Sequence, residues 1–157
     1  MIESEETIEA NIAALVESAS PGLQVVGALA PSADGTEKLA PLSHIGVVAD
    51  VASQDLDWQG GGLPCTYSVR VSVHVAFADD KTGALFRSVC RAVRGALDAL
   101  LGDGCAALNG DGFYCDSFVL GSTSTILESL GDGEGMNKTY SATVSGRFIH
   151  PTNSTNQ

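Results

Sequence analysis

Strict alternation of apolar and polar residues marks the segment from Tyr67 to Phe77. The odd positions are Tyr67, Val69, Val71, Val73, Val75 and Phe77, and the even positions are Ser68, Arg70, Ser72, His74 and Ala76. A period of two is typical of a strand with one face in the core and the other toward solvent. The pattern therefore predicts a long strand whose polar face carries Arg70 and His74.

A helical period follows this strand directly. Apolar residues recur at steps of three and four between Lys81 and Leu101, namely Phe86, Val89, Cys90, Val93, Leu97, Leu100 and Leu101. This spacing predicts a long amphipathic helix. Either Asp79 or Asp80 is placed to cap its start, and Gly102 is placed to end it.

Shorter patterns predict the remaining elements. An amphipathic helix is expected from about Glu5 to Ser18, with acidic residues in its first turns, where the helix dipole favours them. Further strands are expected at Leu23–Leu29, Ile45–Val51, Phe113–Leu120, Ser122–Leu127 and Tyr140–Phe148. Glycine-rich loops are expected at Ser53–Pro64 and at Gly131–Gly135.

This order of elements predicts an α+β fold. We expect a mainly antiparallel sheet of about four to five strands, with the N-terminal helix and a long central helix packed on one face. Residues 1–150 would form a single domain, and the polar residues 151–157 a flexible C-terminal tail.

Charge and composition exclude some classes of function. The chain of 157 residues has 19 acidic and 8 basic side chains, a net charge of −11. Such a chain is poorly suited to gripping nucleic acid through its phosphates, which requires clustered Lys and Arg. No apolar run approaches the roughly 20 residues that span a bilayer, and the acidic start does not resemble a signal peptide, so we expect no membrane and a cytoplasmic origin.

Residues with catalytic or metal-binding chemistry are present without the spacing that such chemistry needs. The four cysteines form no Cys-x-x-Cys pair and are expected to be free thiols in a reducing compartment. His44, His74 and His150 lie in three separate segments, and Gly60-Gly61-Gly62 lacks the lysine of a phosphate-binding loop. We therefore expect no catalytic residues, no metal and no cofactor, and we do not expect an enzyme.

One polar pattern on the long helix suggests an interface. Arg87, Arg91 and Arg94 follow one another at i, i+4 and i+7, so they share an arc of roughly 60°. One interpretation is a solvated helix face. The other is a basic stripe that binds an acidic surface on a neighbouring copy.

The order of elements over residues 5–150 resembles that of the tail terminator proteins of long-tailed bacteriophages, also called tail-completion or minor tail proteins. The resemblance rests on the N-terminal helix, the Pro-led strand Pro41–Val51, the long strand with its acidic turn (Thr66–Asp80), the long helix and the final alternating strand. The family has no sharp motif and no catalytic residue to carry over. The long glycine-rich loops of this chain depart from the shorter members.

The resemblance implies a structural virion protein of the phage neck or tail. Such proteins form a homohexameric ring on the head-proximal end of the tail tube, stop tube polymerisation and join the tail to the head connector. The partners would be other copies of the chain, the tube protein and the connector or stopper protein, with genomic DNA passing through the ring and assembly in the host cytoplasm. On this hypothesis Arg87, Arg91, Arg94, Arg70 and His74 are candidate subunit contacts. Alternatives are another head–tail adaptor, a small-ligand-binding ferredoxin-like module, or a small enzyme.

Overall fold

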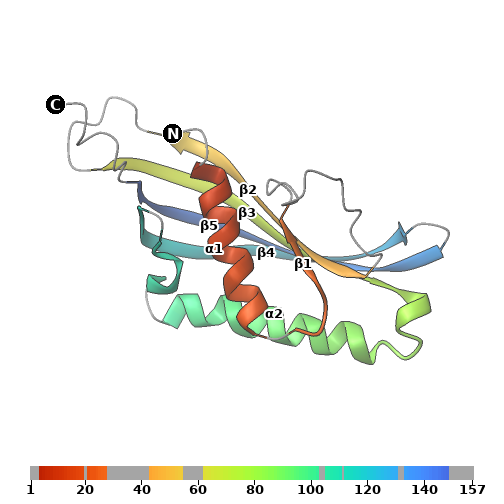
Figure 1. Ribbon diagram of the computed structural model, residues 1–157. Helices are drawn as coiled ribbons and strands as arrows, with labels where there is room; N and C mark the ends of the chain where they lie inside the picture. Colours follow the sequence, from red (N-terminus) through yellow and green to blue (C-terminus); the bar gives the residue numbers. More distant parts are fainter. Residues whose placement is uncertain are drawn as a thin grey trace, which may run out of the picture.

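The described residues of the protein form a five-stranded sheet and two helices. The computed structural model describes residues 4–19, 21–27, 43–54, 62–102, 105–110, 112–130 and 133–148. The elements are α1 (Ser4–Ser18), β1 (Val25–Gly27), β2 (His44–Gln54), β3 (Leu63–Ala76), the 3₁₀ turn η1 (Phe77–Asp79), α2 (Ala84–Gly102), the 3₁₀ turn η2 (Ala106–Leu108), β4 (Phe113–Leu130) and β5 (Gly133–Phe148). Figure 1 shows α1 crossing the sheet and α2 running along it.

The sheet has the strand order β1-β2-β3-β5-β4. Strand β3 lies at its centre and pairs antiparallel with both β2 and β5, and β5 pairs antiparallel with β4. Strand β1 is short and pairs parallel with β2, so that Val25 lies opposite Ile45. The sheet is therefore mixed, with one parallel pair at one edge and the 18-residue strand β4 at the other.

One face of the sheet and both helices enclose the core. The odd positions of β3 from Cys65 to Val75 are buried, as the alternation predicted. Opposite them lie the buried residues of the two helices, namely Ile8, Ile12 and Val16 of α1 and Val89, Val93, Leu97 and Leu100 of α2. Phe77, predicted to continue the buried row, begins η1 instead and is 44% exposed, because the chain leaves the sheet there.

Asp80 fixes the start of α2. Its carboxylate oxygens accept hydrogen bonds from the backbone N–H groups of Leu85 at 3.2 Å and Phe86 at 2.8 Å. The neighbouring Asp79 has another role, since it accepts a hydrogen bond from the hydroxyl of Ser43, just before β2. Of the two predicted capping residues, Asp80 is thus the one that binds the helix.

The prediction of a mainly antiparallel sheet of four to five strands, with an N-terminal helix and a long central helix on one face, is wrong. Strands outweigh helices in the described part of the chain, and the parallel β1–β2 pair makes the sheet mixed. Alternation reports which side of a strand is buried but not the direction in which a neighbour runs. The short run around Val25 therefore could not reveal its parallel pairing.

The second half of the sheet is also longer and more continuous than predicted. The two strands predicted at Phe113–Leu120 and Ser122–Leu127 form one strand, β4, with register shifts after Cys115 and after Leu120. Gly133 to Gly135, predicted as part of a glycine-rich loop, belong to β5, because all three pair with β4 and Gly135 also pairs with β3. The other loop residues 55–61 and 131–132, His150 and the tail 151–157 lie outside the described residues.

A disulfide joins Cys105, just before η2, to Cys115 in β4, so the prediction of four free thiols is wrong. Cys105 adopts a left-handed backbone conformation with φ of 65°, and the turn that follows brings the chain back beside α2. Cys65 and Cys90 are free and buried. A close contact in the same region involves Gly146, because a Cβ there would lie 2.6 Å from Cζ of Phe113.

Candidate functional site

The face of the sheet opposite the helices is the main candidate surface. It carries the even positions of β3 and their partners across the sheet, which pair in register: Ser72 lies opposite Gly46 and Thr139, and Arg70 lies opposite Val48 and Ser141. Small hydroxyl side chains dominate this face. Within the described ranges, neither helix packs on this face.

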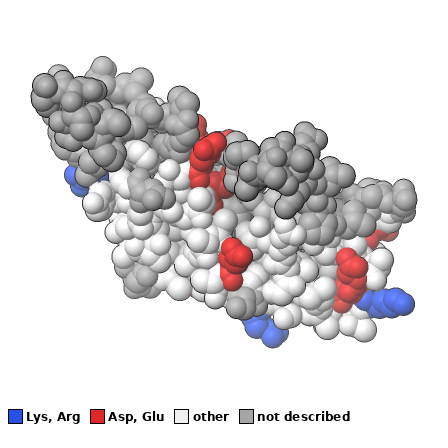
Figure 2. Space-filling view, in the orientation of Figure 1, with Lys and Arg blue, Asp and Glu red and all other residues white. Residues whose placement is uncertain are grey.

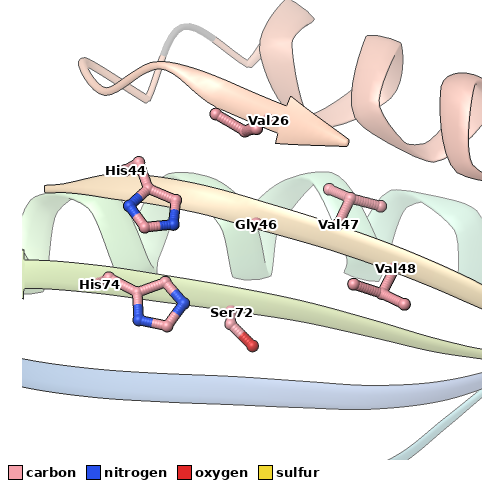
Figure 3. A pocket seen from close by; sticks show the side chains of 7 residues that line it. All are labelled: Val26, His44, Gly46, Val47, Val48, Ser72 and His74. Atoms are coloured by element: carbon pink, nitrogen blue, oxygen red, sulfur yellow. The ribbon is translucent and has the colours of Figure 1, made fainter. Parts of the chain in front are cut away.

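Two histidines stack on this face. His44 of β2 lies directly opposite His74 of β3, and their ring centroids are 4.5 Å apart with an angle of 18° between the planes. Gly46 lies beside both, because a Cβ at that position would be 3.9 Å from Nε2 of His74 and 4.0 Å from Nε2 of His44. The missing side chain leaves room beside the rings, which Figure 3 shows next to each other.

The stacked histidines line a shallow hollow with a volume of about 240 Å³. Its other walls are apolar or small, namely Val26 of β1, Gly46, Val47 and Val48 of β2, and Ser72 of β3. Figure 3 shows Val26 above the strand that carries His44. The hollow is open at the surface and combines imidazole, hydroxyl and aliphatic groups, which suits a side chain of another protein as well as a small ligand.

A chain of hydrogen bonds orients His74. The Thr139 hydroxyl donates to Oδ1 of Asn137 at 2.8 Å, which directs the Asn137 amide nitrogen toward Nδ1 of His74 at 3.1 Å. Since the Thr139 hydrogen is used in this way, Ser72 donates to Thr139 across their 3.1 Å contact. His74 Nδ1 therefore accepts a hydrogen bond, which places the proton of the neutral ring on Nε2, beside Gly46.

Charged groups are sparse on this face. Arg70 is exposed near the middle of β3, and among the described residues no ion pair involves it. Arg147 of β5 is 3.5 Å from Asp116 of β4, with both side chains about half exposed. Such exposed pairs contribute at most about 1 kcal/mol to stability. The face is therefore polar and weakly charged, although the whole chain carries a charge of −11.

The predicted arginine stripe lies on the other side of the molecule. Arg87, Arg91 and Arg94 are all exposed on α2, which packs on the opposite face of the sheet. Figure 2 shows basic side chains along the lower edge, where α2 runs. Nε of Arg94 donates to Asp98 at 2.9 Å, so one of the three arginines already has an acidic partner on its own helix. The five predicted contact residues thus form two separate surfaces, with Arg70 and His74 on one and the stripe on the other.

The pairing of His44 with His74 was not predicted from the sequence. The segment from His44 to Asp50 shows alternation, and this places His44 on the polar face of its strand. The missing information was the register between β2 and β3, which no local pattern gives. Over the same described ranges, no group of three or more His, Cys, Asp or Glu side chains is arranged to hold a metal ion.

The described helices include none that is long and apolar enough to cross a membrane. Comparison with protein-family models and with curated proteins gave no match to this chain. Any functional assignment therefore depends on the residues and surfaces of the protein itself.

Proposed function

We propose that the protein is a structural subunit of a phage neck or tail, a tail terminator that forms a hexameric ring. The ring would cap the head-proximal end of the tail tube, stop tube polymerisation and join the tail to the head connector, with DNA passing through its hole. The observation that carries the proposal is the one-sided packing of the sheet. Both helices cover one face, and the other face, on which the described residues place no helix, is a broad polar surface.

Charge distribution supports an assembly role. The net charge is −11, yet four of the eight basic residues lie between Lys81 and Arg94. Separate acidic and basic regions on one chain favour contacts between copies, because opposite charges orient the encounter. An acidic inner wall would also let DNA pass without sticking to it.

Mass measurement of the purified protein tests the proposal. Native mass spectrometry is expected to show a hexamer, or a monomer that forms rings only when tail tubes are added. A stable dimer that retains a small metabolite would contradict it and would favour the ligand-binding alternative, for which the His44–His74 hollow is the natural site.

The arginine stripe provides a second test. Changing Arg87, Arg91 and Arg94 together to Glu is expected to leave the circular dichroism spectrum unchanged and to block ring formation or tail completion. Glu17→Lys, at an exposed position of α1, is a control that also changes surface charge. Normal tails assembled from the triple variant would show that the stripe is only a solvated helix face.

A further inference from the structure

A second hollow lies at the junction of η1 and α2, on the helix side of the molecule. It has a volume of about 360 Å³. Its apolar lining comes from three parts of the chain: Val75 at the end of β3, Phe77 and Phe86 on either side of the turn, and Met136 of β5. Phe77 is 44% exposed here, which is unusual for a large aromatic side chain.

Two cations border this apolar lining. Lys81 and Arg87 are both exposed, and among the described residues neither forms an ion pair. Gly83 has a φ of +78°, and a side chain there would lie 3.5 Å from Nη2 of Arg87. The absence of that side chain leaves space for the Arg87 guanidinium close to the turn.

Asp80 also borders the hollow, but its carboxylate serves the helix. It accepts hydrogen bonds from the N–H groups of Leu85 and Phe86, so its oxygens are directed toward the first turn of α2. The helix start is capped in this way, and the side chains of Lys81 and Arg87 are the groups left to attract an anion. An apolar lining with two cations at its border suits a segment that combines aliphatic and acidic residues.

This chain contains such a segment at its own start. Residues 1–6 read Met-Ile-Glu-Ser-Glu-Glu, an aliphatic pair followed by three acids. Glu5 and Glu6 lie in the first turn of α1. Figure 1 shows that the first turn of α1 and the η1–α2 junction lie at opposite ends of the molecule, which argues against the segment reaching the hollow of its own chain.

We propose that the hollow lined by Phe77, Phe86 and Met136, with Lys81 and Arg87, binds the acidic segment Met1–Glu6 of a second copy. This inference rests on the proposed ring and names its contact. Because the two surfaces are different and lie at opposite ends, the contact is head-to-tail. Repeated around a rotation axis, such a contact closes into a ring, whereas without closure it gives a filament.

A charge-swap experiment tests this contact. The double variant Lys81→Glu/Arg87→Glu reverses the charge at the border of the hollow. The double variant Glu3→Lys/Glu6→Lys reverses the charge of two residues of the segment. Each variant alone is expected to weaken self-association at least tenfold in analytical ultracentrifugation, and an equimolar mixture is expected to restore it. Glu17→Lys, at an exposed position of α1 outside the segment, is the matched control for Glu6→Lys and is expected to leave self-association unchanged.

The outcomes separate the contact from the proposed function. If the wild-type protein assembles and neither swap changes its assembly, the contact is refuted while the ring stands. If the wild-type protein does not assemble even on tail tubes, the ring is refuted. Binding of a fluorescent peptide of residues 1–10 to the wild type and to the Lys81→Glu/Arg87→Glu variant then tests whether the hollow is the binding site. Binding that the Lys81→Glu/Arg87→Glu variant weakens at least tenfold supports the contact, and equal binding to both proteins overturns it.

Discussion

Removing the Asp80 carboxylate is expected to destabilise the whole domain, although the residue lies outside any helix or strand. Its two oxygens accept hydrogen bonds from the backbone N–H groups of Leu85 and Phe86, which have no partner within the helix. Asp80→Ala leaves both groups without this acceptor. Asp80→Asn keeps a single acceptor oxygen and removes the charge that the helix dipole favours.

The expected loss of stability follows from the contributions that helix-capping residues make in other proteins. Replacing a capping Asp by Ala costs about 0.5–2 kcal/mol. For a domain of this size a loss of 1 kcal/mol lowers the melting temperature by about 2–4 °C. We therefore expect Asp80→Ala to lower the melting temperature by about 1–8 °C, and the melting temperature of Asp80→Asn to lie between those of this variant and the wild type.

The effect should depend on pH in a defined direction. Burial raises the pKa of Asp80, but hydrogen bonds from the N–H groups of Phe86, Leu85, Gly83 and Thr82 outweigh burial, so the pKa lies below its ordinary value of 3.8. A carboxyl whose pKa is lower in the folded state stabilises the fold at pH values above its unfolded pKa. The stabilisation by Asp80 is therefore complete near neutral pH and is lost as the pH falls below about 3.8.

Urea unfolding of the wild type and both variants, at pH 7 and at several values down to pH 3, measures this effect. Asp116→Asn is the control, because this carboxylate is exposed and is expected to change the free energy of unfolding by less than about 1 kcal/mol. A loss below about 0.5 kcal/mol for Asp80→Ala at pH 7 would refute the assigned cap. A difference between wild type and Asp80→Asn that does not shrink toward low pH would refute the role of the charge.

Three further predictions concern the core and the disulfide. Gly146→Ala should destabilise the protein by about 1–3 kcal/mol or more through overpacking, whereas Gly95→Ala, at an open position on α2, should stabilise it by about 0.5–1 kcal/mol. Urea unfolding compares the two variants, and equal effects would contradict the packing at Gly146. Changing Cys105 and Cys115 to Ser should lower the free energy of unfolding by about 2–3 kcal/mol, since the bond closes a short loop; thiol titration of the unfolded, unreduced wild type should find two reactive groups, and four would exclude the bond. Burial raises the pKa of Tyr140 to about 12, so the contribution of its protonated hydroxyl to stability is complete below pH 10 and is lost as the pH rises toward 12. Tyr140→Phe should remove this part of the pH dependence of alkaline unfolding. An unchanged pH profile in the variant would disprove the prediction.

The helices and strands of this fold could be predicted because the spacing of apolar residues in each one shows which of its faces is buried. The alternation around Val71 and the helical period through Val93 identify the two sides of the core, and both residues are buried. The direction of a strand and the identity of its neighbours in the sheet leave no such pattern in the sequence. The run at Val25 predicts a strand, but only the complete sheet shows that it is parallel to β2.

The candidate site was predicted in part for the same reason. Alternation places Arg70 and His74 on one face of β3, and the structure confirms that both lie on the face opposite the helices. The stacking of His74 on His44 depends on the register of two strands that are far apart in the sequence. The Cys105–Cys115 bond likewise depends on a turn with a left-handed residue, for which a cysteine gives no sequence signal.

Strand β4 has a consequence for handling the protein. It is the last strand of the sheet, and the eleven residues from Ser117 to Leu127 include no charged residue and no proline. Val119, Ile126 and Leu127 are each more than half exposed along it. Neutral, proline-free edge strands are templates for intermolecular pairing. The negative charge of the chain is carried elsewhere, so no charge on this stretch opposes pairing between copies. We expect precipitation of concentrated samples to begin at this strand, and Thr125→Lys would be the first substitution to try against it.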